Sequence, residues 1–211
     1  MIIMLPILVL AQSANDYFDK AIKEFHQGNY NEAIAYFQKC IQNEPVNSIE
    51  AEAYANIAAI NNLNAEYEKS IMNSSKSIDI DSLNIKAYVE RGAANLALGN
   101  KSIAVTDFTV ALNLDQKNRF PFSRIRAFVG RGLARNGLGD YNGAIKDYDS
   151  AIALGSHDAK NPEILKAYFG RGVSKIKLGQ YESGCSDISM AGKLGSKQAY
   201  EFANKHCNSI K

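Results

Sequence analysis

The stretch Gly130-Arg-Gly-Leu-Ala-Arg-Asn-Gly-Leu-Gly139 has the glycine content of a loop that surrounds a phosphate group. Such a loop follows a strand and continues into Gly-Lys-Ser or Gly-Lys-Thr, because backbone N–H groups and the lysine bind the phosphates together. This stretch has neither flank. Its glycines recur with the same spacing as Gly92 and Gly99, Gly132 and Gly139, and Gly172 and Gly179. We therefore interpret them as packing positions of a repeated helical hairpin.

The histidines and cysteines do not indicate metal or nucleophile chemistry. His26, His157 and His206 lie in different parts of the chain, and no Cys-x-x-Cys or His-x-x-x-His spacing occurs, so we expect no metal site. Ser, Cys and carboxylate residues form no nucleophile–base arrangement that the sequence reveals. We expect no catalytic residue and no cofactor, and we predict that the protein is not an enzyme. A hydrolase would need a polar pocket in the binding groove described below.

Charge is distributed unevenly along the chain. The 211 residues carry a formal net charge of +2, with 46% hydrophobic and 22% charged residues, which is typical of a folded soluble protein. Residues 1–84 contain five Lys or Arg against eleven Asp or Glu, a net charge of −6. Residues 85–211 contain nineteen against eleven, a net charge of +8, and this asymmetry affects partners more than fold. Because the Lys and Arg residues form no clustered run, we expect no nucleic-acid partner.

The amino-terminal residues 1–11 are predicted to be a signal peptide. The apolar run Met1-Ile-Ile-Met-Leu-Pro-Ile-Leu-Val-Leu-Ala11 is about half the length that spans a bilayer, so no integral membrane span is expected. Val9 and Ala11 occupy the −3 and −1 positions of a cleavage site before Gln12. The run departs from signal peptides because no Lys or Arg precedes it. We predict export, to the periplasm or out of the cell; the alternative is an apolar strap lying on the first helix.

Three segments in the second half of the chain follow one pattern. They are Tyr88-Val-Glu-Arg-Gly-Ala-Ala-Asn-Leu-Ala-Leu-Gly99, Phe128-Val-Gly-Arg-Gly-Leu-Ala-Arg-Asn-Gly-Leu-Gly139 and Tyr168-Phe-Gly-Arg-Gly-Val-Ser-Lys-Ile-Lys-Leu-Gly179. Each is followed by a second helical stretch that contains an Asp, and two fainter copies precede them, beginning near Tyr17 and Tyr54. Self-similarity of this kind indicates a repeat architecture, in which each unit buries its apolar face against its neighbours.

These residues resemble the tetratricopeptide repeat, a helix–turn–helix unit of 34 residues. In the register of that family, the units begin at Ala14, Ala51, Ile85, Ile125 and Leu165. An aromatic residue occupies position 4 of every unit, and Gly or Ala occupies position 15. The sequence departs from the family at Lys101 (position 17) and at Ser74 and Ile188 (the aromatic position 24), and only Pro45 keeps the proline of position 32. The resemblance covers nearly all of the chain after residue 13.

The resemblance implies an all-α fold, a right-handed α-solenoid of helix–turn–helix hairpins. Its five repeats would span residues 14–47, 51–84, 85–118, 125–158 and 165–198, and a C-terminal capping helix would span residues 197–208. Small residues at positions 8, 20 and 27 allow close helix packing, and the Gly at position 15 ends the first helix in a left-handed conformation. Asn161-Pro162-Glu163 is typical of an N-cap followed by a first helical turn. We therefore expect the leading helices of the fourth and fifth repeats to begin about one turn early.

Arg and Asp occur together at two positions of the last three repeats. Position 7 is Arg91, Arg131 and Arg171, and position 23 is Asp107, Asp147 and Asp187. The first two repeats have neither, with Lys20 and Ile57 at position 7 and Tyr36 and Asn73 at position 23. Because the two positions are about equally far from the hairpin turn on facing helices, we predict an Arg–Asp ion pair inside each of the last three repeats. The alternative is a set of unrelated surface charges.

Cys185 and Cys207 are predicted to form a disulfide. They lie at similar distances on either side of a turn near Gly195, so an antiparallel hairpin places them side by side. The bond suits an exported chain, and it would hold the terminal helix in place. The alternative is two reduced cysteines in a cytosolic protein. Cys40, at the small position 27, is expected to be a buried thiol.

Tetratricopeptide proteins generally bind partners on the concave face, which the first helix of each repeat lines. The resemblance therefore implies a groove with an apolar floor and a basic rim, formed by Lys86, Val89, Arg126, Val129, Leu133, Lys166, Phe169, Val173 and Lys177. The family's carboxylate clamp for heat-shock chaperone tails needs Lys, Asn and Arg at set positions of this face. Only Asn56 and Lys86 match, whereas Phe18, Ile22 and Glu90 do not, so we expect no such chaperone partner.

The predicted function is that of a non-enzymatic scaffold for protein–protein interaction. It would bind a segment of another protein in the concave groove, and the basic rim favours an acidic peptide segment. The alternative is an accessory or assembly subunit of an envelope enzyme complex that uses its convex or lateral faces. A single partner on the concave face favours the first interpretation, and a large convex interface favours the second.

Overall fold

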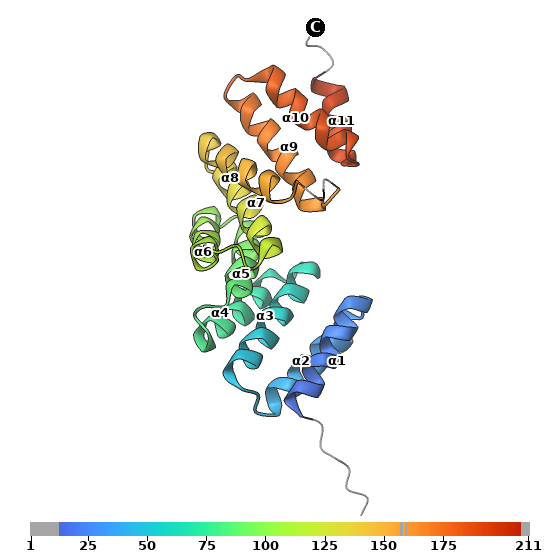
Figure 1. Cartoon of the computed structure of the whole chain (residues 1–211), viewed down its shortest axis with the longest axis vertical. Helices are drawn as coiled ribbons and strands as arrows, with labels where there is room; N and C mark the ends of the chain where they lie inside the picture. Colours follow the sequence, from blue (N-terminus) through green and yellow to red (C-terminus); the bar gives the residue numbers. More distant parts are fainter. Residues whose placement is uncertain (1–12, 157, 159, 208–211) are drawn as a thin grey trace, which may run out of the picture.

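The computed structural model describes residues 13–156, 158 and 160–207, and these residues form eleven α-helices and no strand (Figure 1). The helices pair as hairpins: α1 (Ala14–Gln27) with α2 (Tyr30–Gln42), α3 (Asn47–Leu63) with α4 (Tyr67–Ile80), α5 (Ile85–Ala97) with α6 (Lys101–Leu114), α7 (Pro121–Gly137) with α8 (Tyr141–Leu154), and α9 (Pro162–Lys177) with α10 (Tyr181–Lys193). A last helix, α11 (Lys197–His206), packs against α10. The prediction of an all-α solenoid with a capping helix is confirmed. The predicted signal peptide lies outside the described residues, as does residue 208 of the predicted cap.

The hairpins stack in one direction along the long axis of the molecule. The first helices α3, α5, α7 and α9 contact one another in sequence, while α4, α6 and α8 lie along one edge (left in Figure 1). α1 and α11 lie toward the opposite side, at the two ends of the array. The face between them is the concave face, and the second helices form the convex face. Among the described helices, none is long and apolar enough to cross a membrane.

Each hairpin turns at a residue in the left-handed conformation, as the glycines at position 15 predict. The φ angles are 83°, 83°, 84° and 79° at Gly28, Gly99, Gly139 and Gly179. The second hairpin uses Ala65 at the same place with a φ of 58°, although a side chain makes this conformation less favourable.

Three leading helices begin earlier than the register of the family. α7 begins at Pro121 and α9 at Pro162, with Pro in the first turn of each. Asn161 caps α9 by accepting a hydrogen bond from the N–H of Glu163. The expected early start of the fourth and fifth repeats is therefore present. α3 also begins early, at Asn47, which was not predicted from the sequence.

Aromatic side chains of the second helices fill the space between neighbouring hairpins. Phe108 and Tyr148 are 1% and 0% exposed. A Cβ atom on Gly130 would lie 2.3 Å from the Phe108 ring, and one on Gly170 would lie 2.5 Å from the Tyr148 ring. Each ring therefore requires a glycine on the following hairpin, because a larger residue would occupy the volume of the ring.

The junction between the second and third hairpins is packed differently. Ser74 replaces the aromatic residue on α4, and Glu90 stands on α5 where the next two hairpins have glycine. Ser74 is 0% and Glu90 1% exposed. A small residue on one hairpin thus accompanies a long polar one on the next, and this junction is polar where the later ones are aromatic.

Candidate binding groove and ion-pair ladder

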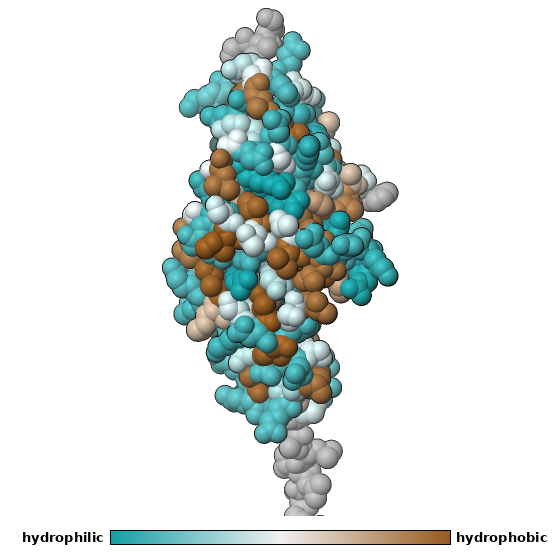
Figure 2. Space-filling view, turned by 90° about the vertical axis from the view of Figure 1, so that its left-hand side faces the viewer, coloured by the Kyte–Doolittle hydropathy of each residue, from teal (hydrophilic) through white to brown (hydrophobic). Residues whose placement is uncertain are grey.

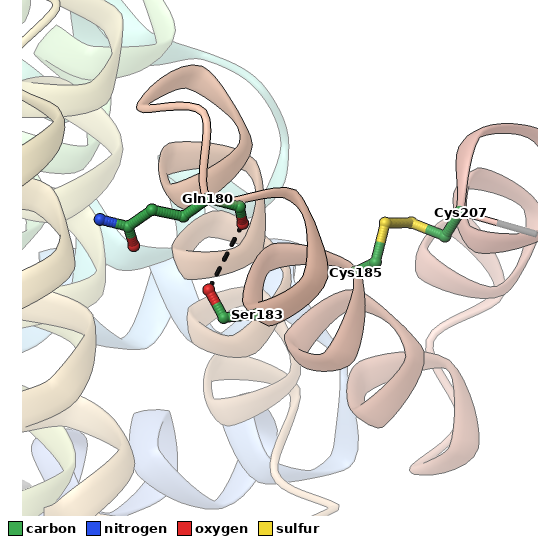
Figure 3. The surroundings of a disulfide bond; sticks show 4 residues. All are labelled: Gln180, Ser183, Cys185 and Cys207. Carbon is green, nitrogen blue, oxygen red and sulfur yellow. Dashed lines mark hydrogen bonds between the residues drawn. A yellow bond between two sulfur atoms is a disulfide. The ribbon is translucent and has the colours of Figure 1, made fainter. Parts of the chain in front are cut away.

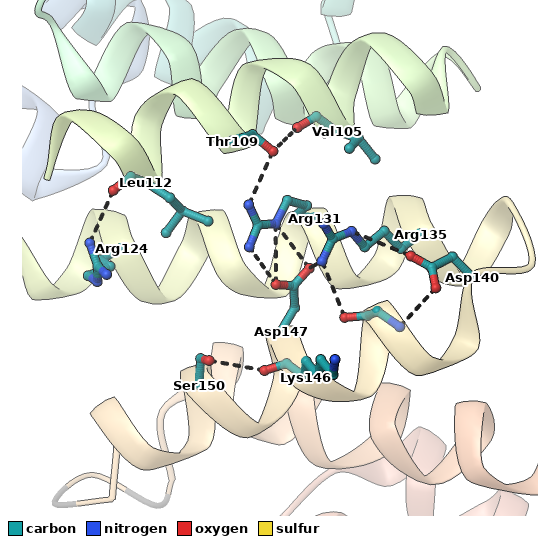
Figure 4. A network of polar contacts seen from close by, with 11 residues as sticks. Val105, Thr109, Leu112, Arg124, Arg131, Arg135, Asp140, Lys146, Asp147 and Ser150 are labelled. Atoms are coloured by element: carbon teal, nitrogen blue, oxygen red, sulfur yellow. Dashed lines mark hydrogen bonds and ion pairs between the residues drawn. The ribbon is translucent and has the colours of Figure 1, made fainter. Parts of the chain in front are cut away.

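The structure brings together the Arg and Asp side chains of each of the last three hairpins. Arg131 Nη2 lies 2.7 Å from Asp147 Oδ1, and Arg131 Nε lies 3.0 Å from Asp147 Oδ2 (Figure 4). The pair of Arg91 and Asp107 has the same two-point geometry at 2.8 and 3.1 Å. Two-point contacts of this kind fix the guanidinium plane as well as its position. The three acids are 4%, 3% and 10% exposed in the order of the hairpins, so these are interior pairs.

Each of these arginines also reaches back to the preceding hairpin. The Nη1 atoms of Arg91 and Arg131 donate to the hydroxyl oxygens of Ser75, at 3.3 Å, and Thr109, at 3.1 Å. Arg171 Nη1 donates to Asp149 Oδ1 at 2.6 Å. We call the three Arg–Asp pairs together with these third partners the ion-pair ladder. It connects successive second helices. This connection was not predicted, although Ser75, Thr109 and Asp149 all occupy position 25 of their repeats.

The structure joins Cys185 and Cys207 by a disulfide, with their Cα atoms 5.5 Å apart (Figure 3). The bond ties the end of α11 to the first part of α10. Cys40 is a free, buried cysteine, and burial, assisted by Glu50, raises the pKa of its thiol.

The capping helix covers part of the predicted groove. Phe169 on α9 makes an edge-to-face contact with Phe202 on α11, with ring centroids 5.7 Å apart. Val173 packs against the same core cluster, which contains Ala199 and Ala203 of α11. Phe169 and Val173 were expected on an open floor, and the structure corrects this. The capping helix covers the exposed apolar face of the last hairpin by packing on the same residues that would otherwise contact a ligand.

The rest of the predicted floor is small. Val89 and Val129 are each 1% exposed and belong to the core, whereas Leu133 is 38% exposed. A hollow of about 150 Å³ remains between α5, α7 and α9. Five of the nine predicted groove residues line it: Val89, Arg126, Val129, Leu133 and Lys166. We call this the concave hollow.

The predicted basic rim is bound within the chain. Arg126 donates to both carboxylate oxygens of Glu90, at 2.5 and 3.1 Å, and Lys166 Nζ lies 2.8 Å from Glu163 Oε1. Lys86 Nζ donates to Asn56 Oδ1 at 2.5 Å, outside the concave hollow. Lys166 and Lys177 are exposed, whereas Lys86 and Arg126 are half-buried. Three of the four rim cations thus already have partners within the chain, which differs from the expected row of cations free to meet a partner.

Glu90 is the centre of a polar cluster that was not predicted from the sequence. Burial would raise the pKa of its carboxyl, but the Arg126 guanidinium and a hydrogen bond from Asn62 more than offset this, and the pKa of Glu90 lies below its ordinary value. Burial lowers the pKa of the nearby Lys86 amine, although Glu90 and Glu52 oppose that shift. The signal that could have revealed the cluster is Glu90 itself, a charged residue at a position where the later repeats carry glycine.

Across the described part of the chain, no three His, Cys, Asp or Glu side chains are grouped as metal ligands would be. The concave hollow holds apolar side chains and carboxylates that are already neutralised by cations. Such a surface suits the binding of side chains from another molecule.

Comparison with known proteins agrees with the fold. The family model of the tetratricopeptide repeat matches residues 24–47, from the end of α1 to just beyond α2. DnaJ homolog subfamily C member 7 from Homo sapiens is 28% identical over 107 residues, which are 51% of this chain and 21% of that protein. The Mus musculus protein gives the same values. This chain thus spans about a fifth of the length of the curated relatives that it matches.

Solved structures resemble this one over most of its length. A crystal structure of MamA has a TM-score of 0.65 at 20% identity and covers 89% of this chain and 94% of its own. MamA from Desulfovibrio magneticus RS-1 has a TM-score of 0.68 at 16% identity, covering 89% and 98%. YrrB, described as a TPR protein with an unusual peptide-binding site, has a TM-score of 0.65 at 15% identity, covering 92% of each chain. These likenesses show the tetratricopeptide fold, which is typical of scaffolds for protein–protein interaction and is generally non-enzymatic.

Proposed function

We propose that this solenoid of tetratricopeptide repeats is a scaffold that binds a segment of another protein on its concave face, at the concave hollow. The observation that carries the proposal is Leu133, which is 38% exposed beside a recess lined by Leu96 and Ala93. An exposed apolar side chain next to a recess provides area that a partner side chain can bury. The pairs Arg126–Glu90 and Lys166–Glu163 surround the recess with polar groups.

An acidic segment fits the surrounding charge. Residues 85–211, which supply the concave hollow, carry a net charge of +8, so they attract negative segments even though Arg126 and Lys166 have carboxylate partners of their own. The attraction would act mainly on the rate of association and would weaken with added salt. Apolar contact at Leu133 would supply most of the affinity.

The test uses a fluorescein-labelled synthetic peptide in which leucines alternate with glutamates, and it measures fluorescence anisotropy with the full chain. Leu133→Asp should weaken binding at least tenfold. Leu138→Asp is the matched control, because Leu138 is also exposed (53%) and ends the same helix but does not line the concave hollow. Equal effects of the two substitutions, or none from either, would place the binding surface elsewhere.

We also propose that the protein is exported to an oxidising compartment. The pairing of Cys185 with Cys207 supports this, because disulfides persist in such compartments. Protein isolated from the native host should begin at Gln12 and should contain one free thiol, that of Cys40. A chain that retains residues 1–11 and has all three cysteines reduced would contradict the proposal.

A further inference from the structure

An open groove crosses the molecule between the first and second hairpins. It has a volume of about 730 Å³, and α2, α3 and α4 line it. Its apolar residues include Ile34, Ile41, Ile57 and Met72, and Met72 is 52% exposed. We call it the seam groove. It is distinct from the concave hollow, with which it shares no lining residue.

The seam groove lies where the ion-pair ladder is missing. At the later junctions an arginine at position 7 spans the space between successive second helices. The second hairpin has Ile57 at this position and Asn73 in place of the partner Asp. The position that would supply the third partner is Gln38. All three line the seam groove, so the space is open where no guanidinium fills it.

Hairpin packing agrees with this explanation. α2 packs less extensively against α3 than α4 packs against α5, and α1 packs less extensively against α3 than α3 packs against α5. The first hairpin is therefore less closely docked than the others. Met72 and the half-buried Ile34 and Ile41 are therefore available to a partner, whereas Ile57 is buried at the base of the groove.

The spacing of the lining residues is that of helices packed around another helix. On α2 the lining residues include Asn31, Ile34, Gln38 and Ile41. The same three–four–three spacing recurs along α3 and its C-cap, as Tyr54, Ile57, Asn61 and Asn64, and along the N-cap of α4 and the helix itself, as Glu66, Lys69, Asn73 and Lys76. Such faces accept the side chains of a facing helix. Three turns of helix are roughly 16 Å long, which defines the length of the occupant.

We propose that the seam groove binds an amphipathic helix of about three turns from a partner protein, with a basic outer side. The lining itself carries a net charge of only +1, because Glu66 pairs with Lys69 at 2.7 Å and the Lys76 amine, which lies over the Tyr54 ring, is its one further charge. Residues 1–84 as a whole carry a net charge of −6. Apolar and carboxamide residues of the helix therefore face inward, and its Lys and Arg residues face the acidic surroundings.

The experiment compares two labelled 15-residue synthetic helices that share one apolar stripe and carry either Lys or Glu on the outer side. Fluorescence anisotropy with the full chain should show at least tenfold tighter binding of the Lys peptide at low salt, and this preference should shrink as salt is added. Equal binding of the two peptides, or tighter binding of the Glu peptide, overturns the proposal.

A charge-neutral double variant tests the site. Ile57→Arg with Asn73→Asp reproduces the pair found at the later junctions and should fill the seam groove. Binding of the Lys peptide should then weaken at least tenfold. Circular dichroism should show an unchanged helix content. If this variant does not fold, Met72→Gln replaces it, and we expect its affinity for the Lys peptide to fall fivefold. Met190→Gln is the control, because Met190 is similarly exposed (43%) on α10. Full binding by the folded double variant, or by Met72→Gln, overturns the proposal.

Other occupants give different results. If the peptide binds only after residues 1–12 are deleted, the chain's own amino-terminal segment fills the seam groove. If a dimer dissociates on Met72→Gln, a second copy fills it, and either result overturns the proposal. Leu133→Asp should leave Lys-peptide binding unchanged, which separates this site from the concave hollow. A helix bound here would also favour the accessory-subunit interpretation, which requires contacts outside the concave face.

Discussion

Replacing Asp147 with Asn should destabilise the fourth hairpin by about 3–5 kcal/mol, the range for removing one partner of a buried ion pair. The Asp147 side chain is 3% exposed and accepts hydrogen bonds from Arg131 at 2.7 and 3.0 Å and from Arg135 at 2.9 Å. A neutral amide accepts at one atom only, so the Arg131 guanidinium, 14% exposed, is left without its counter-charge. Arg135 is 27% exposed and can turn toward water, so we assign most of the loss to Arg131.

Thermal unfolding and hydrogen exchange together measure the effect. For a chain of this size, 1 kcal/mol corresponds to roughly 2–4 °C in Tm, so a drop of about 6–20 °C is expected if the array unfolds as one unit. Because repeat arrays can open locally, amide exchange should accelerate first in α7 and α8. The control is Asp149→Asn on the same helix, since the Asp149 side chain is 53% exposed and an exposed pair contributes at most about 1 kcal/mol.

A double variant separates the stranded charge from the loss of the pair. Arg131→Met with Asp147→Leu removes both charges and should restore most of the lost stability, because buried pairs are often replaced by apolar residues at little cost. The reasoning is refuted if Asp147→Asn is no more damaging than Asp149→Asn. It is also refuted if the double variant is as unstable as Asp147→Asn alone, since the defect would then be one of packing.

Three further predictions concern the ion-pair ladder, the disulfide and the Arg126–Glu90 pair. Thr109→Asp should give Arg131 a carboxylate partner on the preceding hairpin, as Asp149 is for Arg171. The substitution should raise Tm by a few degrees, corresponding to about 0.5–1 kcal/mol. An unchanged or lower Tm would show that a charged third partner adds no stability. Cys207→Ser should lower the free energy of unfolding by about 3 kcal/mol in urea titrations under oxidising conditions. Adding a reducing agent should lower the free energy of unfolding of the parent protein by the same amount. Because Arg126 keeps the folded pKa of Glu90 below its unfolded value, the stability from this pair is complete above about pH 4.3 and is lost as pH falls through the folded pKa. The urea midpoint should therefore decline in acid, and it should decline less in a Glu90→Gln variant that is already less stable at pH 7.

The sequence predicted those features that repeat along it. Arg131 and Asp147 could be paired because the two residue types appear together in three hairpins and are absent together in two. The hairpin turns followed from glycines at one position, and Ala65 adopts the same left-handed backbone without a glycine. In each case one repeat supplies evidence about the others, so the spacing of the residues alone was enough to predict the contact or the turn.

Features found once were harder to predict. Phe169 has the same register position as Val89 and Val129, but it packs under Phe202 because only the last hairpin meets a cap. The contact between Arg126 and Glu90 joins different repeats, and a register built on single repeats does not place such pairs. The seam groove depends on Ile57, whose departure from Arg was visible in the sequence. Its effect on packing was not, because the width of a junction follows from how two hairpins dock.

The disulfide and the junction that lacks the ion-pair ladder lie at opposite ends of the array. The two ends of the molecule should therefore resist a pulling force differently. A motor that pulls on the amino terminus would first load the junction that has no guanidinium across it. A motor that pulls on the carboxyl terminus would first meet a covalent bond between α10 and α11. Resistance to threading through a narrow pore should therefore depend on which end enters. The hairpins would come free one at a time from the first, and the loop that the disulfide closes between α10 and α11 could not extend until that bond is reduced.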